Sequence, residues 1–363
     1  STVCYALLGK ALGNEHVRGL HIDNGFMRKN ESAFVMKALE HQGLHLEFVD
    51  ASQQFIDALQ GITDPEEKRK IIGEVFVKVA QDAMRDMHTE GWLLAQGTIY
   101  PDTIESQGTK HAALIKTHHN RVEVMRQLLK EGKVIEPIKQ LYKDEVRALG
   151  VALGLPSALV NRKPFPGPGL AVRCLCNAEE SFDHPDNGRL QEMVLPLKGV
   201  IAPVKSVGVQ GDERTYKHPA IIYGGADWDQ LDALSSIPNK LPSVNRMIYL
   251  LSPSVPPLSL KKATLTRQRL SLLRDIDALV RESTSKNGSN DLWQFPVIMA
   301  PMGNVHGESI ILRPVHSQEA MTATYAKLDL GQMKVLAERI RSMGIDAVYY
   351  DFTTKPPGTI EWE

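Results

Sequence analysis

The spacing of apolar residues near the start of the chain predicts a helix followed by a strand, a helix and a second strand. Apolar residues recur at helical spacing over 3–12, and Gly13 suits the end of a helix. A strand-like stretch follows at 17–23, then an amphipathic stretch at 31–44 and an alternating, strand-like stretch at 44–50. This order predicts a βαβ unit with a parallel strand pair.

The next two elements extend this alternation of helices and strands. A proline followed by two glutamates begins a predicted helix over 65–87, and the apolar run at 92–95 predicts a strand that ends just before Gly97 and Thr98. Alternating strands and helices indicate an α/β fold with a doubly wound, mostly parallel sheet. Such sheets bind ligands beyond the carboxyl ends of their strands, which here are 97–98 and 23–25.

The pattern changes in the second half, where we expect a separate α+β domain. A segment rich in proline and glycine ends at Arg173, so we place a first domain at 1–173 and a second at 174–363. Within the second domain, two segments each resemble two strands, a helix and a strand. They lie at about 194–256 and 292–363, which suggests an internal duplication.

Composition excludes several classes of protein. The chain has 363 residues, 42% hydrophobic and 23% charged, with a net charge of −1, which is typical of a globular protein of two or three domains. Its three cysteines, Cys4, Cys174 and Cys176, are too few for a disulfide framework and lack the spacing of a zinc site. No apolar run is long enough to span a membrane. We therefore expect a cytoplasmic protein that binds neither membrane nor nucleic acid.

One local segment departs from this neutral average. Residues 107–173 carry twelve Lys and Arg but only five Asp and Glu, which favours an anionic ligand, although a solvated basic face is an alternative. Nearby, Asp102 and Glu105 are spaced as on one helical turn, and a lysine and two histidines follow at Lys116, His118 and His119. Carboxylates bind Mg²⁺, and lysine and imidazole contact phosphate oxygens. The alternatives are an ordinary helix first turn and a structural histidine pair.

The C-terminal sequence T-T-K-P-P-G-T-I-E-W-E is also unusual for a chain end. Its prolines stiffen a region that commonly frays. Lys355 could bind a phosphate, and Glu361 a base or ribose edge. The alternative is that the segment only packs Trp362 against the body of the protein.

Seven ordered motifs, which extend over nearly the whole chain, resemble the GMP synthetase family. The resemblance is to its ATP-pyrophosphatase and dimerisation portions, in the eukaryotic-type form with the longer C-terminal region. The motifs are H-I-D-N-G-F-M-R-K, P-E-E-K-R-K-I-I-G, L-A-Q-G-T-I-Y-P-D-T-I-E-S, L-I-K-T-H-H-N, K-P-F-P-G-P-G-L-A-V-R, S-V-G-V-Q-G-D-E-R-T-Y and K-P-P-G-T-I-E-W-E.

This resemblance implies an N-type ATP pyrophosphatase with an adenine-nucleotide α-hydrolase-like fold that converts XMP to GMP. ATP would transfer AMP to the 2-carbonyl oxygen of XMP with release of pyrophosphate, and ammonia would then displace AMP. Departure of pyrophosphate requires neutralisation of its charge by Mg²⁺ and cationic side chains. The resemblance therefore implies ATP and Mg²⁺ as cofactors and a ligase of purine biosynthesis.

The matching motifs also imply roles for individual residues. The catalytic residues would be Asp102, Lys116 and Glu105, with Asp102 as the ligand of Mg²⁺. The residues implied for ATP and pyrophosphate are Ser1, Thr2, Gly97, Thr98, Thr117, His118, His119, Lys143 and Asp144. Those implied for XMP are Arg69, Asp212, Gln294, Lys355 and Glu361.

The sequence departs from the family pattern at its start. Of the family's phosphate-binding loop S-G-G-V-D-S-T only Ser1 and Thr2 are present, so we expect the loop's glycines to precede them. No cysteine lies in the glycine-flanked turn that a glutaminase nucleophile needs. We therefore expect a glutaminase domain upstream in the same polypeptide, and this chain alone to use free ammonia.

Two other functions are compatible with these motifs. One is another adenylylating enzyme, such as an NAD synthetase or a tRNA-thiolating ligase. A tRNA reader would need a broad basic surface, whereas only one local segment here is basic. The other is a catalytically inactive dimerisation scaffold. The protein itself would be a homodimer or a monomer.

Overall fold

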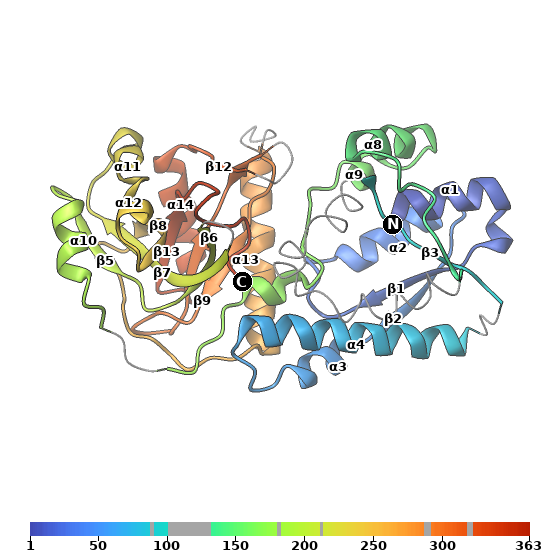
Figure 1. Cartoon of the computed structure of the whole chain (residues 1–363), viewed down its shortest axis with the longest axis horizontal. Helices are drawn as coiled ribbons and strands as arrows, with labels where there is room; N and C mark the ends of the chain where they lie inside the picture. The colour runs from blue at the N-terminus through green and yellow to red at the C-terminus, as the bar shows by residue number, and fades with distance from the viewer. Residues whose placement is uncertain (88–90, 101–131, 180–182, 211–212, 287–291, 318–321) are drawn as a thin grey trace. The chain divides into compact units, whose positions relative to one another are not determined.

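The computed structural model describes the chain except for residues 88–90, 101–131, 180–182, 211–212, 287–291 and 318–321 (Figure 1). It divides into two compact units. The first comprises residues 1–59 and 66–163, and the second comprises residues 60–65 and 164–363.

The first unit confirms the predicted βαβ unit. After the helix α1 (Thr2–Leu12), strand β1 (Gly19–Asp23) pairs in parallel with β2 (Leu46–Asp50), and α2 (Glu31–Glu40) connects them. Helices lie on both sides of this strand pair, with α2 on one side and α4 on the other (Figure 1). The remaining elements of this unit are α3 (Ser52–Ala58), α4 (Pro65–Asp86), β3 (Leu94–Ala95), β4 (Val134–Ile135), α8 (Lys143–Ala152) and α9 (Ser157–Val160).

Apolar residues of helices from both ends of the first unit form one core. Leu39 of α2 and Leu155 and Leu159 near α9 are buried in it together with Ala6 of α1. The strand expected at 92–95 is shorter than predicted, because only Leu94 and Ala95 pair with β4, again in parallel. Helices α1, α2 and α4 agree with their predicted positions.

The second unit is built on one mixed sheet of seven strands. Its order is β5-β7-β8-β13-β10-β9, and β6 pairs with β7. The strands are β5 (Lys198–Ile201), β6 (Ser206–Gln210), β7 (Glu213–Tyr223), β8 (Val244–Ser252), β9 (Val297–Ala300), β10 (Ser309–Leu312) and β13 (Ala347–Asp351).

The parallel and antiparallel pairings along the β5-β7-β8-β13-β10-β9 path follow the same order from either edge of the sheet. Each edge strand is antiparallel to its neighbour, β7 and β10 are parallel to β8 and β13 respectively, and β8 is antiparallel to β13 at the centre. A small strand pair, β11 (Val315–His316) with β12 (Thr324–Tyr325), lies outside this sheet.

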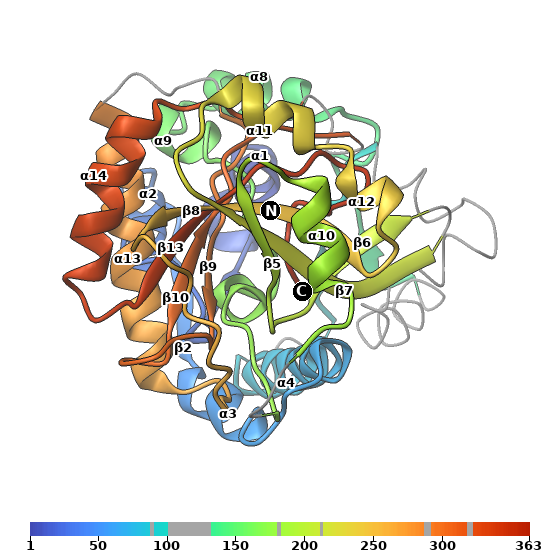
Figure 2. The ribbon, with the colours of Figure 1, turned by 90° about the vertical axis from the view of Figure 1, so that its left-hand side faces the viewer.

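Helices cover the sheet, and α13 and α14 lie side by side against it (Figure 2). The helices of this unit are the 3₁₀ turn η2 (Gly169–Arg173), α10 (Asn187–Met193), α11 (Trp228–Leu234), α12 (Ile237–Lys240), α13 (Arg267–Lys286) and α14 (Leu330–Arg341). None of the helices that the structure describes is long and apolar enough to cross a membrane.

Four consecutive strands of the sheet, β8, β13, β10 and β9, are buried along their whole length. Their sequences are accordingly mostly apolar, as expected for strands covered on both faces, and the polar residues among them, such as Asn245, Arg246 and Asp351, are buried too. Trp362, near the C-terminus, belongs to the same core cluster and is 0% exposed. The C-terminal segment is therefore part of the core of this unit.

Candidate functional site

The C-terminal segment lies beside strand β6, which carries the S-V-G-V-Q part of another motif. The backbone N–H of Val207 donates to the carbonyl of Trp362 at 2.8 Å, and that of Val209 donates to the carbonyl of Pro357 at 2.7 Å. Gly208 lies between them. A Cβ at Gly208 would come within 2.8 Å of the Pro357 carbonyl oxygen, so glycine permits this close approach of two backbones.

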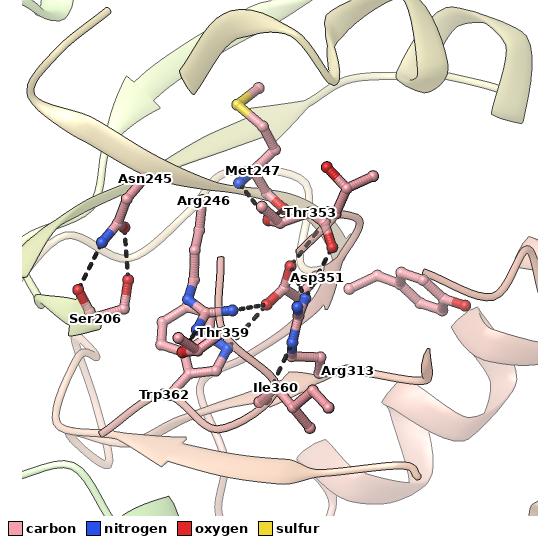
Figure 3. A network of polar contacts seen from close by, with 12 residues as sticks. Ser206, Asn245, Arg246, Met247, Arg313, Asp351, Thr353, Thr359, Ile360 and Trp362 are labelled. Atoms are coloured by element: carbon pink, nitrogen blue, oxygen red, sulfur yellow. Dashed lines mark hydrogen bonds and ion pairs between the residues drawn. The ribbon is translucent and has the colours of Figure 1, made fainter. Parts of the chain in front are cut away.

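Beneath this segment lies a fully buried charge network (Figure 3). Asp351, at the end of β13, forms ion pairs with Arg246 of β8 at 3.1 Å and with Arg313, just after β10, at 2.8 Å. All three side chains are 0% exposed. Charges so deeply buried must be paired, and here each arginine comes from a different half of the sheet.

This network also fixes the C-terminal segment. Arg246 donates to the hydroxyl of Thr359 and to the carbonyl of Glu361, both at 2.8 Å, and its guanidinium lies over the Trp362 ring. Arg313 donates to the carbonyl of Ile360 at 3.1 Å. The indole N–H of Trp362 donates to Asp351 at 2.8 Å. As one of the interpretations of the sequence expected, Trp362 packs against the body of the unit.

Burial and neighbouring charges alter the acid–base behaviour of this network. Burial lowers the pKa of Arg246 to about 9, and repulsion from Arg313 acts in the same direction, while Asp351 opposes it. Burial alone would raise the pKa of Asp351, but Arg313 and Arg246 outweigh it and hold that pKa below its usual range. The charged states of Arg246 and Asp351 therefore depend on each other.

The side chain of Glu361 is held by a third arginine, which sequence reasoning missed as a site residue. Arg173 donates from Nε and Nη2 to the two carboxylate oxygens of Glu361, at 2.8 and 2.7 Å. Arg173 is buried, whereas the side chain of Glu361 is 20% exposed. The signal that could have identified Arg173 is its place as the last residue of the motif K-P-F-P-G-P-G-L-A-V-R.

Two further predicted XMP residues lie in the same unit. The backbone of Lys355 pairs with that of Ala323, and its side chain is half-buried. Gln294 is 8% exposed, and its backbone pairs with Val315. Its side-chain oxygen has no hydrogen-bond partner among the residues that the structure describes. A buried amide oxygen without a partner is costly and is consistent with a ligand-binding role.

The first unit contains the predicted ATP residues that the structure describes. Gly97 lies against the N-terminus of α1, because a Cβ there would come within 2.5 Å of the Ser1 nitrogen. The N–H groups in the first turn of a helix have no partner within that helix, and the Ser1 side chain makes no capping hydrogen bond at α1. A helix N-terminus of this kind attracts anions; Thr2 is the first residue of α1, and Thr98 follows Gly97 in the sequence.

A second contact joins this region to the predicted residues Lys143 and Asp144. The N–H of Tyr100 donates to the carbonyl of Leu141 at 2.9 Å, and the rings of Tyr100 and Tyr142 lie 5.0 Å apart. Lys143 and Asp144 are the first two residues of α8 and directly follow Tyr142. The carboxyl end of β3 and the start of α8 are therefore neighbours within this unit.

Two other predictions concern the first unit. At the end of β1, Asp23 accepts hydrogen bonds from the Gly25 N–H and the Ser32 hydroxyl, both at 2.8 Å, so its carboxylate shapes the turn. Arg69 is buried, and its guanidinium donates to Glu66 one helical turn earlier at 2.7 Å.

Several of the predicted residues lie outside the part of the chain that the structure describes. Among the described residues there is no cluster of three or more His, Cys, Asp or Glu that could hold a metal ion. The carboxylates expected to bind Mg²⁺ are among those not described, which are Asp102, Glu105, Lys116, Thr117, His118, His119 and Asp212.

Comparison with known proteins identifies relatives over the whole chain. Residues 282–362 match the model of the GMP synthase C terminal domain. The whole chain is 45% identical to a probable glutamine-hydrolyzing GMP synthase of Leptospira interrogans, of which it covers 62%. It is 36% identical to the glutamine-hydrolyzing GMP synthase of Dictyostelium discoideum and 34% identical to a probable one of Caenorhabditis elegans, covering 61% and 62% of them. The chain thus spans about three fifths of the length of these relatives.

Proposed function

We propose that the chain belongs to the GMP synthase family, which its similarity to GMP synthases over the whole chain supports, and that it carries the synthetase activity, which aminates XMP to GMP. ATP transfers its AMP group to the 2-carbonyl oxygen of XMP, and pyrophosphate leaves. Ammonia then attacks C2, the C2–O bond breaks, and AMP departs with that oxygen. The first step converts a poor leaving group into a good one.

The C-terminal segment is the observation that carries this proposal. Its backbone is fixed by β6 and the buried arginines, yet the Glu361 side chain stays partly exposed and the Lys355 side chain half-buried. We assign Lys355 to the 5′-phosphate of XMP and Glu361 to N–H groups of its base, because a lysine donates to phosphate oxygens and a carboxylate accepts from N–H donors. Gln294, Asp212 and Arg69 complete the proposed XMP contacts.

The ATP site is proposed at the N-terminus of α1. The close approach of Gly97 to Ser1 leaves room for a backbone but not for a side chain, which suits a phosphate cradle built from main-chain N–H groups. Ser1, Thr2, Thr98, Lys143 and Asp144 would line it. Outside the described residues, Lys116, Thr117, His118 and His119 would contact the phosphates.

The residues proposed for Mg²⁺ fit that ion chemically. Asp102 and Glu105 carry the hard oxygen ligands that Mg²⁺ prefers. Bound there with ATP, Mg²⁺ would neutralise the charge that develops on pyrophosphate.

We further propose that the second unit arose by duplication. The symmetric strand order supports this, since β5, β7 and β8 are matched by β9, β10 and β13. Along the chain, helices α11 and α12 lie between the parallel strands β7 and β8, and α14 lies between the parallel strands β10 and β13. The copies would occupy about 194–256 and 292–363 of a domain at 174–363 that serves dimerisation. The first domain, at 1–173, would have the doubly wound sheet of N-type ATP pyrophosphatases.

The partners proposed for this chain follow from the names of its relatives, which are glutamine-hydrolyzing. A glutaminase domain would supply ammonia from glutamine. The protein would act as a homodimer or as a monomer.

A coupled assay on the full-length protein tests the proposed reaction. It contains XMP, ATP, Mg²⁺ and ammonium at slightly alkaline pH and follows pyrophosphate release and the loss of XMP absorbance. Pyrophosphate release that depends on XMP is expected. ATP turnover with a different acceptor, or none at all, would refute the proposal.

Two variants test the C-terminal assignment in the same assay. Lys355→Ala and Glu361→Ala should each raise KM for XMP roughly 10- to 100-fold, because each removes a charge-assisted hydrogen bond. KM for ATP should not change. Lys334→Ala is the matched control, since Lys334 is an exposed lysine of α14. Unchanged XMP kinetics in both variants would contradict the assignment.

A further inference from the structure

Arg173 and Glu361 form a two-point ion pair at the edge of the proposed XMP site. Both oxygens of the carboxylate are engaged by two nitrogens of one guanidinium, at 2.8 and 2.7 Å. We propose that Arg173 is a positioning residue for XMP, which presets the carboxylate of Glu361 before the base arrives. This inference rests on the proposed function and goes beyond it by assigning a residue to the recognition of the base.

Arg173 is itself held rigidly. It ends the 3₁₀ turn η2, whose residues are all buried, and its guanidinium lies 5.1 Å from the centre of the Phe165 ring. The residues that follow are attached to the sheet, because Cys174 forms a bridge with Met299 of β9 and the Leu175 N–H donates to the Met299 carbonyl at 2.9 Å. Arg173 therefore projects from a fixed platform.

The backbone of Glu361 is held by other residues. Its carbonyl accepts from Arg246 at 2.8 Å, and the next residue, Trp362, is buried in the core and donates to Asp351. The loss of Arg173 would therefore release the Glu361 side chain but not the C-terminal segment. This separation makes a positioning role testable apart from a structural one.

The geometry leaves the carboxylate able to bind a ligand. Two oxygens offer about four lone-pair sites, and the two bonds from Arg173 use one on each oxygen. The side chain is 20% exposed, so the remaining lone pairs can face a base whose ring carries N–H donors, as xanthine does. A carboxylate already fixed in one plane loses little conformational entropy when such a base binds.

The test is a double-mutant cycle on the full-length protein, with KM for XMP and KM for ATP as readouts. Arg173→Lys keeps the positive charge but cannot make the two-point contact. We expect Arg173→Lys and Arg173→Ala to raise KM for XMP roughly 10- to 100-fold with KM for ATP unchanged. In a Glu361→Ala background, Arg173→Ala should change KM for XMP less than about twofold, because its effect passes through Glu361.

Arg269→Lys serves as the matched control. Arg269 of α13 binds both oxygens of Glu308 in the same side-on manner and is likewise mostly buried, and its third hydrogen bond goes to the carbonyl of Thr264. Its substitution should lower the thermal midpoint yet leave KM for XMP unchanged.

Three outcomes overturn the inference. In the first, Arg173→Ala and Glu361→Ala act independently, so that the double variant raises KM for XMP by the product of the two single effects. In the second, the Arg173 variants raise KM for XMP and KM for ATP together and also lower the thermal midpoint, as a merely structural role of Arg173 predicts. The third is normal XMP kinetics in Arg173→Lys. If the wild-type protein itself shows no XMP-dependent pyrophosphate release, the proposed function fails instead, and that result is separate from these three.

Discussion

Asp351→Asn tests whether the buried charge network holds the second unit together. The substitution keeps the shape of the side chain and removes its charge. Two buried guanidiniums, those of Arg246 and Arg313, then face each other across a neutral amide, whereas they now form ion pairs of 3.1 and 2.8 Å with the carboxylate. The indole N–H of Trp362 also donates to the oxygen that pairs with Arg246.

The size of the effect follows from burial. Removing one partner of a fully buried ion pair costs about 3–5 kcal/mol, because the other charge is left uncompensated. Asparagine keeps one accepting oxygen, so we expect the lower end, about 3 kcal/mol. For a domain of this size, at 2–4 °C per kcal/mol, the thermal midpoint should fall by about 6–12 °C.

The cost should depend on pH in a defined direction. The pKa of Asp351 lies below its usual range, since Arg313 and Arg246 outweigh the effect of burial. A lowered carboxyl pKa contributes stability that is complete above the unfolded-state pKa, about 3.9, and is lost as the pH falls through the lower folded-state pKa. The difference in unfolding free energy between wild type and Asp351→Asn should therefore be smaller at pH 3 than at pH 7.

Urea unfolding followed by circular dichroism at both pH values measures this difference. Asp277→Asn is the control, because Asp277 is also buried but pairs with Arg281, which is 41% exposed and can turn to water. We expect that control to cost about 1 kcal/mol or less. A cost below about 1 kcal/mol for Asp351→Asn, or a cost that grows in acid, would refute the reasoning.

Three further substitutions examine other parts of the molecule. Gly97→Ala places a Cβ within 2.5 Å of the Ser1 nitrogen and should raise KM for ATP about 10- to 100-fold in steady-state kinetics, with KM for XMP unchanged. Gly208→Ala places a Cβ within 2.8 Å of the Pro357 carbonyl oxygen and should raise KM for XMP about tenfold, with KM for ATP unchanged. Burial lowers the pKa of His218, so wild-type stability should fall as the pH drops from about 7 to 5, and urea midpoints should show a weaker fall in His218→Gln.

Local features of the sequence predicted the first unit well. Apolar spacing located α1 and α2, and the proline and glutamates that begin α4 marked its start. These signals are local, because caps and helical periodicity act within a few residues. The strand at 92–95 was predicted too long, since its pairing with β4 involves only Leu94 and Ala95, and a distant partner sets that length.

The order of the second sheet could not be predicted in the same way. Strands β8 and β13 are both fully buried and mostly apolar, and their apolar pattern does not specify that each pairs with the other in antiparallel register. The proposed duplication was inferred from a repeated order of elements along the chain. The symmetric arrangement of the strands about the centre of the sheet required the structure.

The sequence predicted the partly exposed residues of the candidate site but not the buried residues that support them. Lys355 and Glu361 stood out in an unusual C-terminal sequence, but the arginines that hold that segment did not. Arg246 and Arg313 each occur within or beside an otherwise apolar strand. A lone arginine in such a run must find a buried partner, and this signal could have indicated the network without naming Asp351.

This network links the folding of the second unit to the preparation of its proposed ligand site. Arg246 and Arg313 each donate a hydrogen bond to a carbonyl of residue 361 or 360, so these two buried side chains lose hydrogen-bond acceptors when the C-terminal segment is not docked. Leaving those buried donors without partners would cost several kcal/mol, which is comparable with the whole stability of a domain. Docking is therefore a condition of folding and precedes ligand binding. Arg173 then fixes the Glu361 carboxylate. The conformational entropy of that side chain would therefore be lost during folding, and XMP would bind to a site that is already ordered.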